Sequence, residues 1–382
     1  MSVLRNTLNM RNLSPLSLLV LTACGGGTST ISTFLTSASG KVIKGPLNNA
    51  LVGLDYDGDG VVDSATVRTD ANGSYSISTT QKTYTVIAVT DESTVDTSSG
   101  TVLSGVTLKA PEGATVITPT TTLMKEGNLT AEQVAIVLGL PDGVDPLTFN
   151  PYADGVSASD ALAVEKASQQ IMSVVTAFAS AAEGAGATEA AAYTAALNSI
   201  VEVVKTKAAS NDTLDLTNTA DLALIKTQAK TEMASTSGVN TTAFDALADD
   251  TATAVENVNT KIATVSDLTS DASKNIFSTT QVLADQVKTA AAAEVSSSGT
   301  GNITFIDASV VNTAASNKAP TNITLSKNAI SEAASSLVIG TLTTADSDQT
   351  TGVKFKYALA EVTGSDYAAF SINQSTGELS LK

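Results

Sequence analysis

The hydrophobic pattern of this 382-residue chain changes its period at Thr118-Pro119. Before that point, short runs of alternating apolar and polar residues are bounded by turn residues, which is the period-two pattern of half-buried strands. After it, apolar residues recur every three or four positions, as they do in amphipathic helices. From about residue 317 the strand pattern returns. The chain therefore predicts three structured segments in the order β, α, β.

The first segment, residues 38–118, contains short runs with strand character. These runs are residues 41–43, 50–54, 65–69, 74–78 and 83–89. Several short strands at such spacing predict a small β-sandwich. Asn72-Gly73 lies between two of the runs and is a typical type I′ turn sequence, because both central positions of that turn need positive φ. It predicts a β-hairpin.

The second segment, residues 119–300, shows helical periodicity. Thr130 begins a capping box with Gln133, and Gly139 predicts the end of that short helix. Longer apolar stripes predict further helices around residues 171–182, 193–204, 222–233, 244–262 and 282–291. Such stripes usually form a core, and no inward-facing metal motif accompanies them. We therefore predict an α-helical bundle that acts as a spacer.

The beginning of the chain has the features of an export signal. Two arginines precede an apolar run at residues 13–21, and two small residues separate that run from Cys24, the single cysteine. This order is typical of a cleaved secretory signal peptide, and the run is too short to span a bilayer. Residues 24–37 are rich in Gly, Ser and Thr, and predict a flexible tether.

Residues 21–24, Leu-Thr-Ala-Cys, resemble the lipobox of bacterial lipoproteins. The resemblance implies that residues 1–23 are removed and that acylated Cys24 anchors the protein to a membrane, where more than one acyl chain gives stable binding. It places the protein in the bacterial cell envelope, exposed to the exterior. Gly25 after the cysteine favours the outer membrane. The alternatives are a signal peptide cleaved without lipid attachment and a buried free thiol.

The composition excludes several classes of function. There are 21 Lys and Arg against 38 Asp and Glu, a formal net charge of −17, which argues against nucleic acid as a partner. The absence of histidine removes the usual general base, the catalytic triads built on it and most zinc sites. No carboxylate pair follows an active-site pattern. We therefore expect a protein that is not an enzyme.

Residues 55–63, Asp-Tyr-Asp-Gly-Asp-Gly-Val-Val-Asp, follow the pattern of a calcium-binding loop. EF-hand-type loops take ligands from positions 1, 3, 5, 7 and 9, with glycine at position 6. Those ligand positions are here Asp55, Asp57, Asp59, Val61 through its carbonyl, and Asp63. Clustered carboxylates repel one another unless a cation lies between them. The pattern therefore predicts a calcium site.

Two features separate this loop from an EF-hand. Its flanks read as strands, and Thr66 stands at position 12, where the EF-hand has a bidentate glutamate. One ligand is therefore missing, and Asp70 is a candidate replacement. The alternative interpretation is a solvated Asp/Gly turn that holds no metal.

The segment from residue 40 to residue 75 resembles the prealbumin-like and B-type repeat domains of bacterial surface adhesins. The resemblance depends on the Asp-x-Asp-Gly-Asp-Gly run at 55–60 and on Thr-Asp-Ala-Asn-Gly-Ser-Tyr at 69–75. It implies that the acidic loop binds calcium in a structural role.

The third segment, residues 317–382, predicts a second β-sandwich. Its strand-like runs are residues 319–326, 337–342, 353–359, 368–372 and 379–381. The order of its short motifs resembles a cadherin-like repeat, an Ig-like sandwich. These motifs are Ala319-Pro320, residues 330–332, residues 338–341, Asp346-Ser347-Asp348, Tyr357, residues 370–372 and residues 376–379.

The cadherin-like resemblance implies calcium-dependent cell adhesion. It makes Glu332, Asp346 and Asp348 candidate calcium ligands, with solvated loop acids as the alternative interpretation. The segment covers about two thirds of a sandwich domain of roughly 100 residues. We therefore expect the sequence to be a fragment with a partial cadherin-like domain.

Together these features predict a calcium-binding surface lipoprotein of adhesin type. Its expected partners are the membrane, through Cys24, and other cell-surface proteins or like molecules. The alternative is the stalk of a larger surface lipoprotein whose enzymatic or glycan-binding module lies beyond Lys382. A downstream catalytic domain would favour the stalk, and further repeats would favour adhesion.

Overall fold

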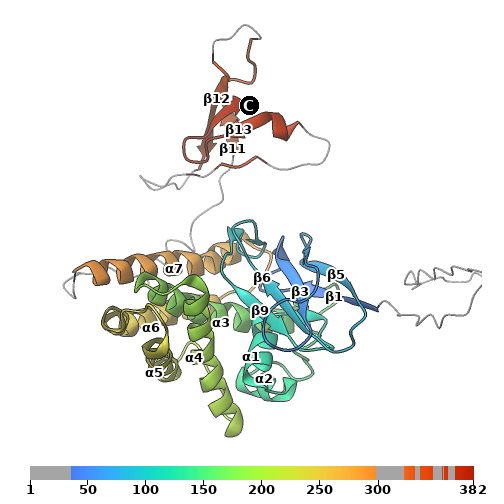
Figure 1. Ribbon diagram of the computed structural model, residues 1–382, viewed down its shortest axis with the longest axis vertical. Coiled ribbons are helices and arrows are strands. Elements are labelled where there is room, and N and C mark those ends of the chain that lie inside the picture. The colour runs from blue at the N-terminus through green and yellow to red at the C-terminus, as the bar shows by residue number, and fades with distance from the viewer. Residues whose placement is uncertain (1–35, 298–321, 332–335, 347–354, 356, 360–365) are drawn as a thin grey trace, which may run out of the picture. The chain divides into compact units, whose positions relative to one another are not determined.

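The computed structural model of the protein describes residues 36–297, 322–331, 336–346, 355, 357–359 and 366–382. Strands come first, helices follow, and strands return near the C-terminus (Figure 1). The predicted order β, α, β is therefore confirmed. The predicted signal peptide, Cys24 with most of the tether, Glu332 and Asp348 lie outside the described residues.

The first region is built of short strands in separate sheets. One sheet has the order β4-β3-β6-β9, and two smaller sheets have the orders β10-β1-β5 and β2-β7-β8. Strand β1 pairs in parallel with β10, and the other pairs are antiparallel. The strands are β1 Thr36–Val42, β2 Leu47–Asn48, β3 Leu51–Asp55, β4 Val67–Arg68, β5 Ser74–Thr79, β6 Thr85–Val89, β7 Val95–Asp96, β8 Thr101–Val102, β9 Thr107–Ala110 and β10 Val116–Ile117.

The predicted hairpin at Asn72-Gly73 is wrong. The two strands that this turn connects, β4 and β5, lie in different sheets. The Gly73 amide donates to the Asp70 carbonyl at 2.9 Å, and within residues 70–73 Gly73 alone has positive φ, at 73°. The Asp70 carboxylate accepts from the amides of Asn72 and Ser74, at 2.8 Å each. An aspartate-stabilised turn with one left-handed residue therefore replaces the type I′ turn.

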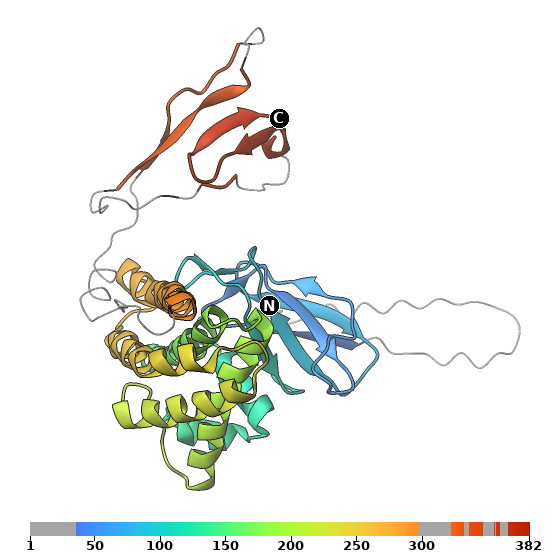
Figure 2. The same ribbon diagram turned by 60° about the vertical axis from the view of Figure 1, so that its left-hand side comes forward.

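The second region consists of helices that follow the predicted stripes. They are α1 Pro119–Gly127, α2 Ala131–Val137, α3 Ala158–Gly184, α4 Glu189–Ala209, α5 Thr219–Ser235, α6 Thr241–Ala263 and α7 Asp271–Ser297. The capping box of α2 is confirmed, because Thr130 and Gln133 exchange hydrogen bonds of 2.9 and 3.2 Å. Helix α3 packs against α4, α6 and α7, which lie around it in the bundle (Figure 2). Within the described residues, no helix is both long and apolar enough to cross a membrane.

Helix α1 was not predicted, because its first turns are rich in threonine, a residue of low helix propensity. Its threonines also bond to strand β9. Thr122 Oγ1 accepts from the Lys109 amide at 2.9 Å, and Thr121 Oγ1 donates to the Lys109 carbonyl at 2.9 Å. Tertiary contacts with the sheet therefore stabilise a helix that the sequence alone does not favour.

Strands and helices of residues 36–297 share one hydrophobic core. The cluster includes Leu108 on β9, Leu123 on α1, and Phe178 on α3, all fully or almost fully buried. The Tyr193 hydroxyl of α4 also donates to the Thr107 carbonyl of β9 at 2.7 Å. The boundary predicted near residue 118 is therefore a change of element type within a continuous core.

The C-terminal strands form a separate four-stranded antiparallel sheet with the order β11-β12-β14-β13. Its elements are β11 Asn322–Leu325, β12 Val338–Ala345, the short 3₁₀ helix η1 Tyr367–Ala369, β13 Phe370–Ile372 and β14 Glu378–Leu381. The strand predicted at 353–359 is wrong for the residues described there, since Phe355 and residues 357–359 have no strand conformation. The Tyr357 amide instead makes a single hydrogen bond, of 3.0 Å, to the Gln374 carbonyl.

Candidate metal site

The acidic loop begins where strand β3 leaves the sheet. The last residue of β3, Asp55, is 2% exposed, and the chain then turns out towards solvent. It returns to the same strand end, because the amides of Asp63 and Ser64 both donate to the Leu54 carbonyl, at 2.8 and 3.1 Å. The Leu54 amide in turn donates to Ser64 Oγ at 2.8 Å. Both ends of the loop are therefore fixed to β3.

Asp55 organises the turn inside the loop. Its Oδ1 accepts from the Gly58 amide at 2.7 Å, and its Oδ2 accepts from the Gly60 amide at 3.0 Å. Both glycines have positive φ, 83° and 88°, a conformation that residues with a Cβ adopt only at a cost. The alternation of aspartate and glycine is therefore explained in part by the turn itself, which needs these hydrogen bonds and positive φ angles whether or not a metal binds.

Three carboxylates converge in this loop. Asp55, Asp57 and Asp63 each offer an oxygen, and these oxygens lie within 4.8 Å of one another. Oxygens on opposite sides of one calcium ion, at 2.3–2.6 Å from it, are separated by about 5 Å. The three aspartates are therefore close enough to bind a single cation. No other group of this kind occurs in the described part of the chain.

Backbone amides hold the three carboxylates in place. Asp57 Oδ1 accepts from the Asp59 amide at 3.1 Å, and Asp63 Oδ2 accepts from the Tyr56 amide at 2.7 Å. The bonds to Asp55 come from the loop glycines described above. The orientation of each ligand is thus set by the folded loop, so that little ordering remains to oppose metal binding.

The remaining predicted ligands do not belong to this group of three carboxylates. Asp59 is outside the converging group, and its Oδ1 accepts from the Val61 amide at 2.8 Å. The Val61 side chain is 62% exposed. Asp70, the candidate replacement, is also outside the group; the hydrogen bond from the Ser74 backbone is the main cause of its lowered pKa. Asp346 directly follows β12 and is half-buried.

Comparisons with protein-family models, with curated proteins and with solved structures find no match for this chain. The family resemblances that the sequence suggests are therefore still predictions.

Proposed function

We propose that this protein is a calcium-binding surface lipoprotein of adhesin type, anchored in the bacterial envelope by acylated Cys24. In this proposal the first strands form a β-sandwich, the helices act as a spacer, and the C-terminal strands belong to a cadherin-like sandwich. The convergence of Asp55, Asp57 and Asp63 within 4.8 Å, in a loop fixed at both ends, supports it. Calcium would hold the loop in shape rather than take part in chemistry.

Calcium suits this loop better than magnesium does. Magnesium requires near-ideal octahedral geometry and keeps several of its waters, whereas calcium accepts irregular shells of six to eight oxygens. The loop combines one buried carboxylate, on Asp55, with two exposed ones, on Asp57 and Asp63. Sites of extracellular modules typically bind calcium at 10⁻⁴–10⁻³ M, a range that matches an exposed site on an exterior protein.

Millimolar calcium is expected to raise the melting temperature of the protein by several degrees, because a ligand that binds only the native state stabilises it. Asp57→Asn should reduce the shift, since it removes one charge from the group and keeps an oxygen that can accept the Asp59 amide. Asp142→Asn is the matched control, because Asp142 is another exposed aspartate that precedes a glycine. Thermal melts in EDTA and in calcium measure both effects, and equal melting temperatures for the wild type would contradict the calcium site.

Bacteria that express the chain are expected to aggregate in millimolar calcium and to disperse in EDTA. Cys24→Ala should shift the protein from the membrane fraction to the soluble fraction and abolish aggregation, because the acyl anchor is lost. Cell fractionation and turbidity measure the two effects. If Cys24→Ala stays in the membrane fraction, the proposed lipid anchor is wrong. If the turbidity of the cell suspension is the same in calcium and in EDTA, the proposed calcium-dependent adhesion is wrong.

A further inference from the structure

A cavity of about 320 Å³ lies where helices α3, α4 and α7 meet strand β8 and the segment that follows it. Its volume is at the lower end of the roughly 300–1,000 Å³ that small-molecule sites occupy. One side is helical, because α3 and α7 pack against each other. On the other side, the Gly105 amide donates to the Thr90 carbonyl at 3.2 Å. The walls of the cavity are therefore fixed in the folded protein.

The charged side chains that line this cavity are three carboxylates and one amine. They are Glu183 on α3, Glu189 on α4, and Asp285 and Lys288 on α7. Lys288 Nζ lies 2.6 Å from Glu183 Oε2, so one carboxylate is already paired. The hydrogen bond to Glu183 raises the pKa of Lys288, burial lowers it, and the charges of Glu183, Glu189 and Asp285 raise it further. Three formal negative charges against one positive charge leave an excess of two, which favours a cation.

Two of the carboxylates keep oxygens that no other group uses. Within the described part of the chain, Glu189 makes no ion pair and no hydrogen bond. Its Oε1 lies over the backbone of Gly105, where any Cβ would clash with it. Asp285 accepts from Gln281 Nε2 at 3.2 Å through Oδ1, and its Oδ2 has no such bond. These oxygens are therefore available to donors of a ligand.

A hydroxyl group of α3 faces the same cavity without a partner. Ser180 is 7% exposed, lines the cavity, and makes no hydrogen bond to any described residue. Thr176, one turn earlier on the same face, also lines it. A buried serine in a helix can donate to the carbonyl four residues earlier, as Ser199 does to Ala195 at 2.7 Å. Because a buried hydroxyl without a partner is costly, Ser180 points to a polar ligand.

The chemistry of the cavity selects the kind of cation. Val106, Ala179 and Ala284 give it an apolar wall, each at most 4% exposed, on which an aliphatic chain can pack. Among the described residues, only the acidic loop brings three carboxylate oxygens within 4.8 Å of one another, so the cavity does not offer a metal ion a converging group. A guanidinium presents five N–H donors in a fixed plane and can serve acceptors on different elements.

We propose that this cavity binds a guanidinium group carried on an aliphatic chain. Glu189 and Asp285 accept from its nitrogens, and the Ser180 hydroxyl accepts a further N–H group. Lys288 is a competing cation that keeps Glu183 paired. The guanidinium belongs either to a free small molecule or to an arginine side chain of a partner protein. No residue among those that line the cavity belongs to the acidic loop, so this proposal does not rest on calcium binding.

Isothermal titration calorimetry of the whole chain with agmatine, a guanidinium on an aliphatic chain, tests this proposal. We expect a Kd of about 0.1–1 mM, as for a ligand of this size. Putrescine, an aliphatic diamine without guanidinium, should bind at least about tenfold more weakly. No binding at several millimolar agmatine, or equal binding of putrescine, would overturn the proposal.

A short arginine peptide with blocked ends distinguishes the two sources of the guanidinium. If it binds as tightly as agmatine does, the cavity accepts the arginine side chain of a partner protein. If agmatine alone binds, the ligand is a free small molecule. Either result supports a guanidinium site.

Variants locate the binding in this cavity. Glu189→Gln should weaken agmatine binding at least about tenfold, because it removes the charge of an unpaired carboxylate. Glu202→Gln is the matched control, because Glu202 lies on the same helix but does not line the cavity, and its Kd should equal that of the wild type. Asp57→Asn should also leave the Kd unchanged. An unchanged Kd in Glu189→Gln, or a loss of binding in Asp57→Asn, would overturn the assigned site.

Two further variants change binding without removing a carboxylate. Lys288→Gln should tighten agmatine binding by about threefold or more, because it removes the competing cation. Ser180→Ala should weaken binding several-fold and leave the melting temperature unchanged, because the hydroxyl has no partner to lose in the free protein. Weaker binding in Lys288→Gln would show that the ligand is not a cation, and would overturn the proposal.

Discussion

Replacing Phe178 by alanine is expected to lower the free energy of unfolding by about 4 kcal/mol, because truncation of a buried phenylalanine removes its transfer energy and leaves a cavity. Phe178 lies on α3 and is 1% exposed. Its ring centre lies 6.4 Å from that of Phe244 on α6, with the ring planes inclined by 43°. The same cluster of buried residues extends into the β region through Leu108. The strands should therefore lose stability together with the helices.

Urea denaturation and amide hydrogen exchange measure this effect. Phe178→Ala should reduce the protection of β6 and β9 amides as much as that of α3 amides, if residues 36–297 unfold as one unit. Leu224→Ala is the matched control, because Leu224 on α5 is 50% exposed and surface truncations usually change stability by less than about 0.5 kcal/mol. Unchanged protection in the strands would show that the two regions unfold independently.

Local patterns predicted most of the helices. The apolar stripes around residues 171–182 and 244–262 lie within α3 and α6, and the capping box at Thr130 marks the start of α2. These signals depend on residues three or four positions apart, so they can be read without knowledge of the fold. Helix α1 was missed because its stability comes from contacts with β9.

Strand pairing could not be predicted from such local patterns. Asn72-Gly73 does form a turn, but whether β4 and β5 pair with each other depends on partners far away in the sequence. Strand β5 pairs with β1, and β4 pairs with β3. Turn residues therefore predict that the chain reverses, without predicting which sheet the next strand joins.

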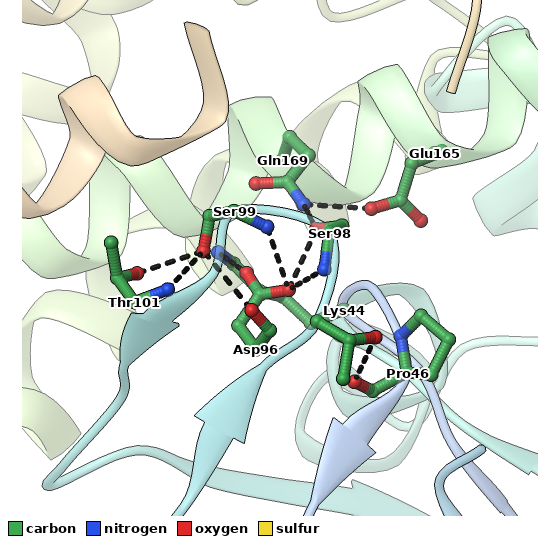
Figure 3. A network of polar contacts seen from close by, with 9 residues as sticks. Lys44, Pro46, Asp96, Ser98, Ser99, Thr101, Glu165 and Gln169 are labelled. Atoms are coloured by element: carbon green, nitrogen blue, oxygen red, sulfur yellow. Dashed lines mark hydrogen bonds and ion pairs between the residues drawn. The ribbon is translucent and has the colours of Figure 1, made fainter. Parts of the chain in front are cut away.

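The acidic loop and the buried polar cluster around Asp96 show the same contrast. The carboxylates of Asp55, Asp57 and Asp63 come from one short loop, so their spacing predicts that they converge. The ion pair of Lys44 and Asp96 joins residues 52 positions apart, and the bond from Gln169 to Ser98 joins residues 71 positions apart (Figure 3). Charged and polar residues are mostly exposed, and no local pattern in the sequence marks these as buried. Only the fold identifies this cluster.

Replacing Glu165 by glutamine is expected to stabilise the protein at and above neutral pH by roughly 3 kcal/mol. The pKa of Glu165 is raised from its ordinary value of 4.5 to about 7, the net result of several effects. Burial and, to a smaller extent, the charge of Asp96 raise this pKa, whereas the hydrogen bond from Gln169 and the charge of Lys44 lower it. Burial, rather than either neighbouring charge, is therefore the main cause of the raised pKa.

The sign of the effect follows from proton binding. Between about pH 4.5 and pH 7 the folded protein keeps the Glu165 proton and the unfolded chain loses it, so this group's contribution to stability falls as pH rises. Below about pH 4 the carboxyl group is protonated in both states, and the wild type and Glu165→Gln should be similarly stable. Above about pH 7 the wild type carries the full cost of a buried carboxylate, whereas glutamine stays neutral and can still accept from Gln169.

Urea denaturation at pH 4, 6 and 8 measures the difference in unfolding free energy between wild type and Glu165→Gln. Using the difference cancels the titration of exposed aspartates, which both proteins share. Glu112→Gln is the control, because Glu112 lies in a loop and is exposed, so its difference from wild type should stay near zero at every pH. A Glu165→Gln difference that is constant from pH 4 to pH 8 would mean that this carboxyl group is hydrated in the folded protein, and helix α3 would then not seal the polar cluster around Asp96 from water.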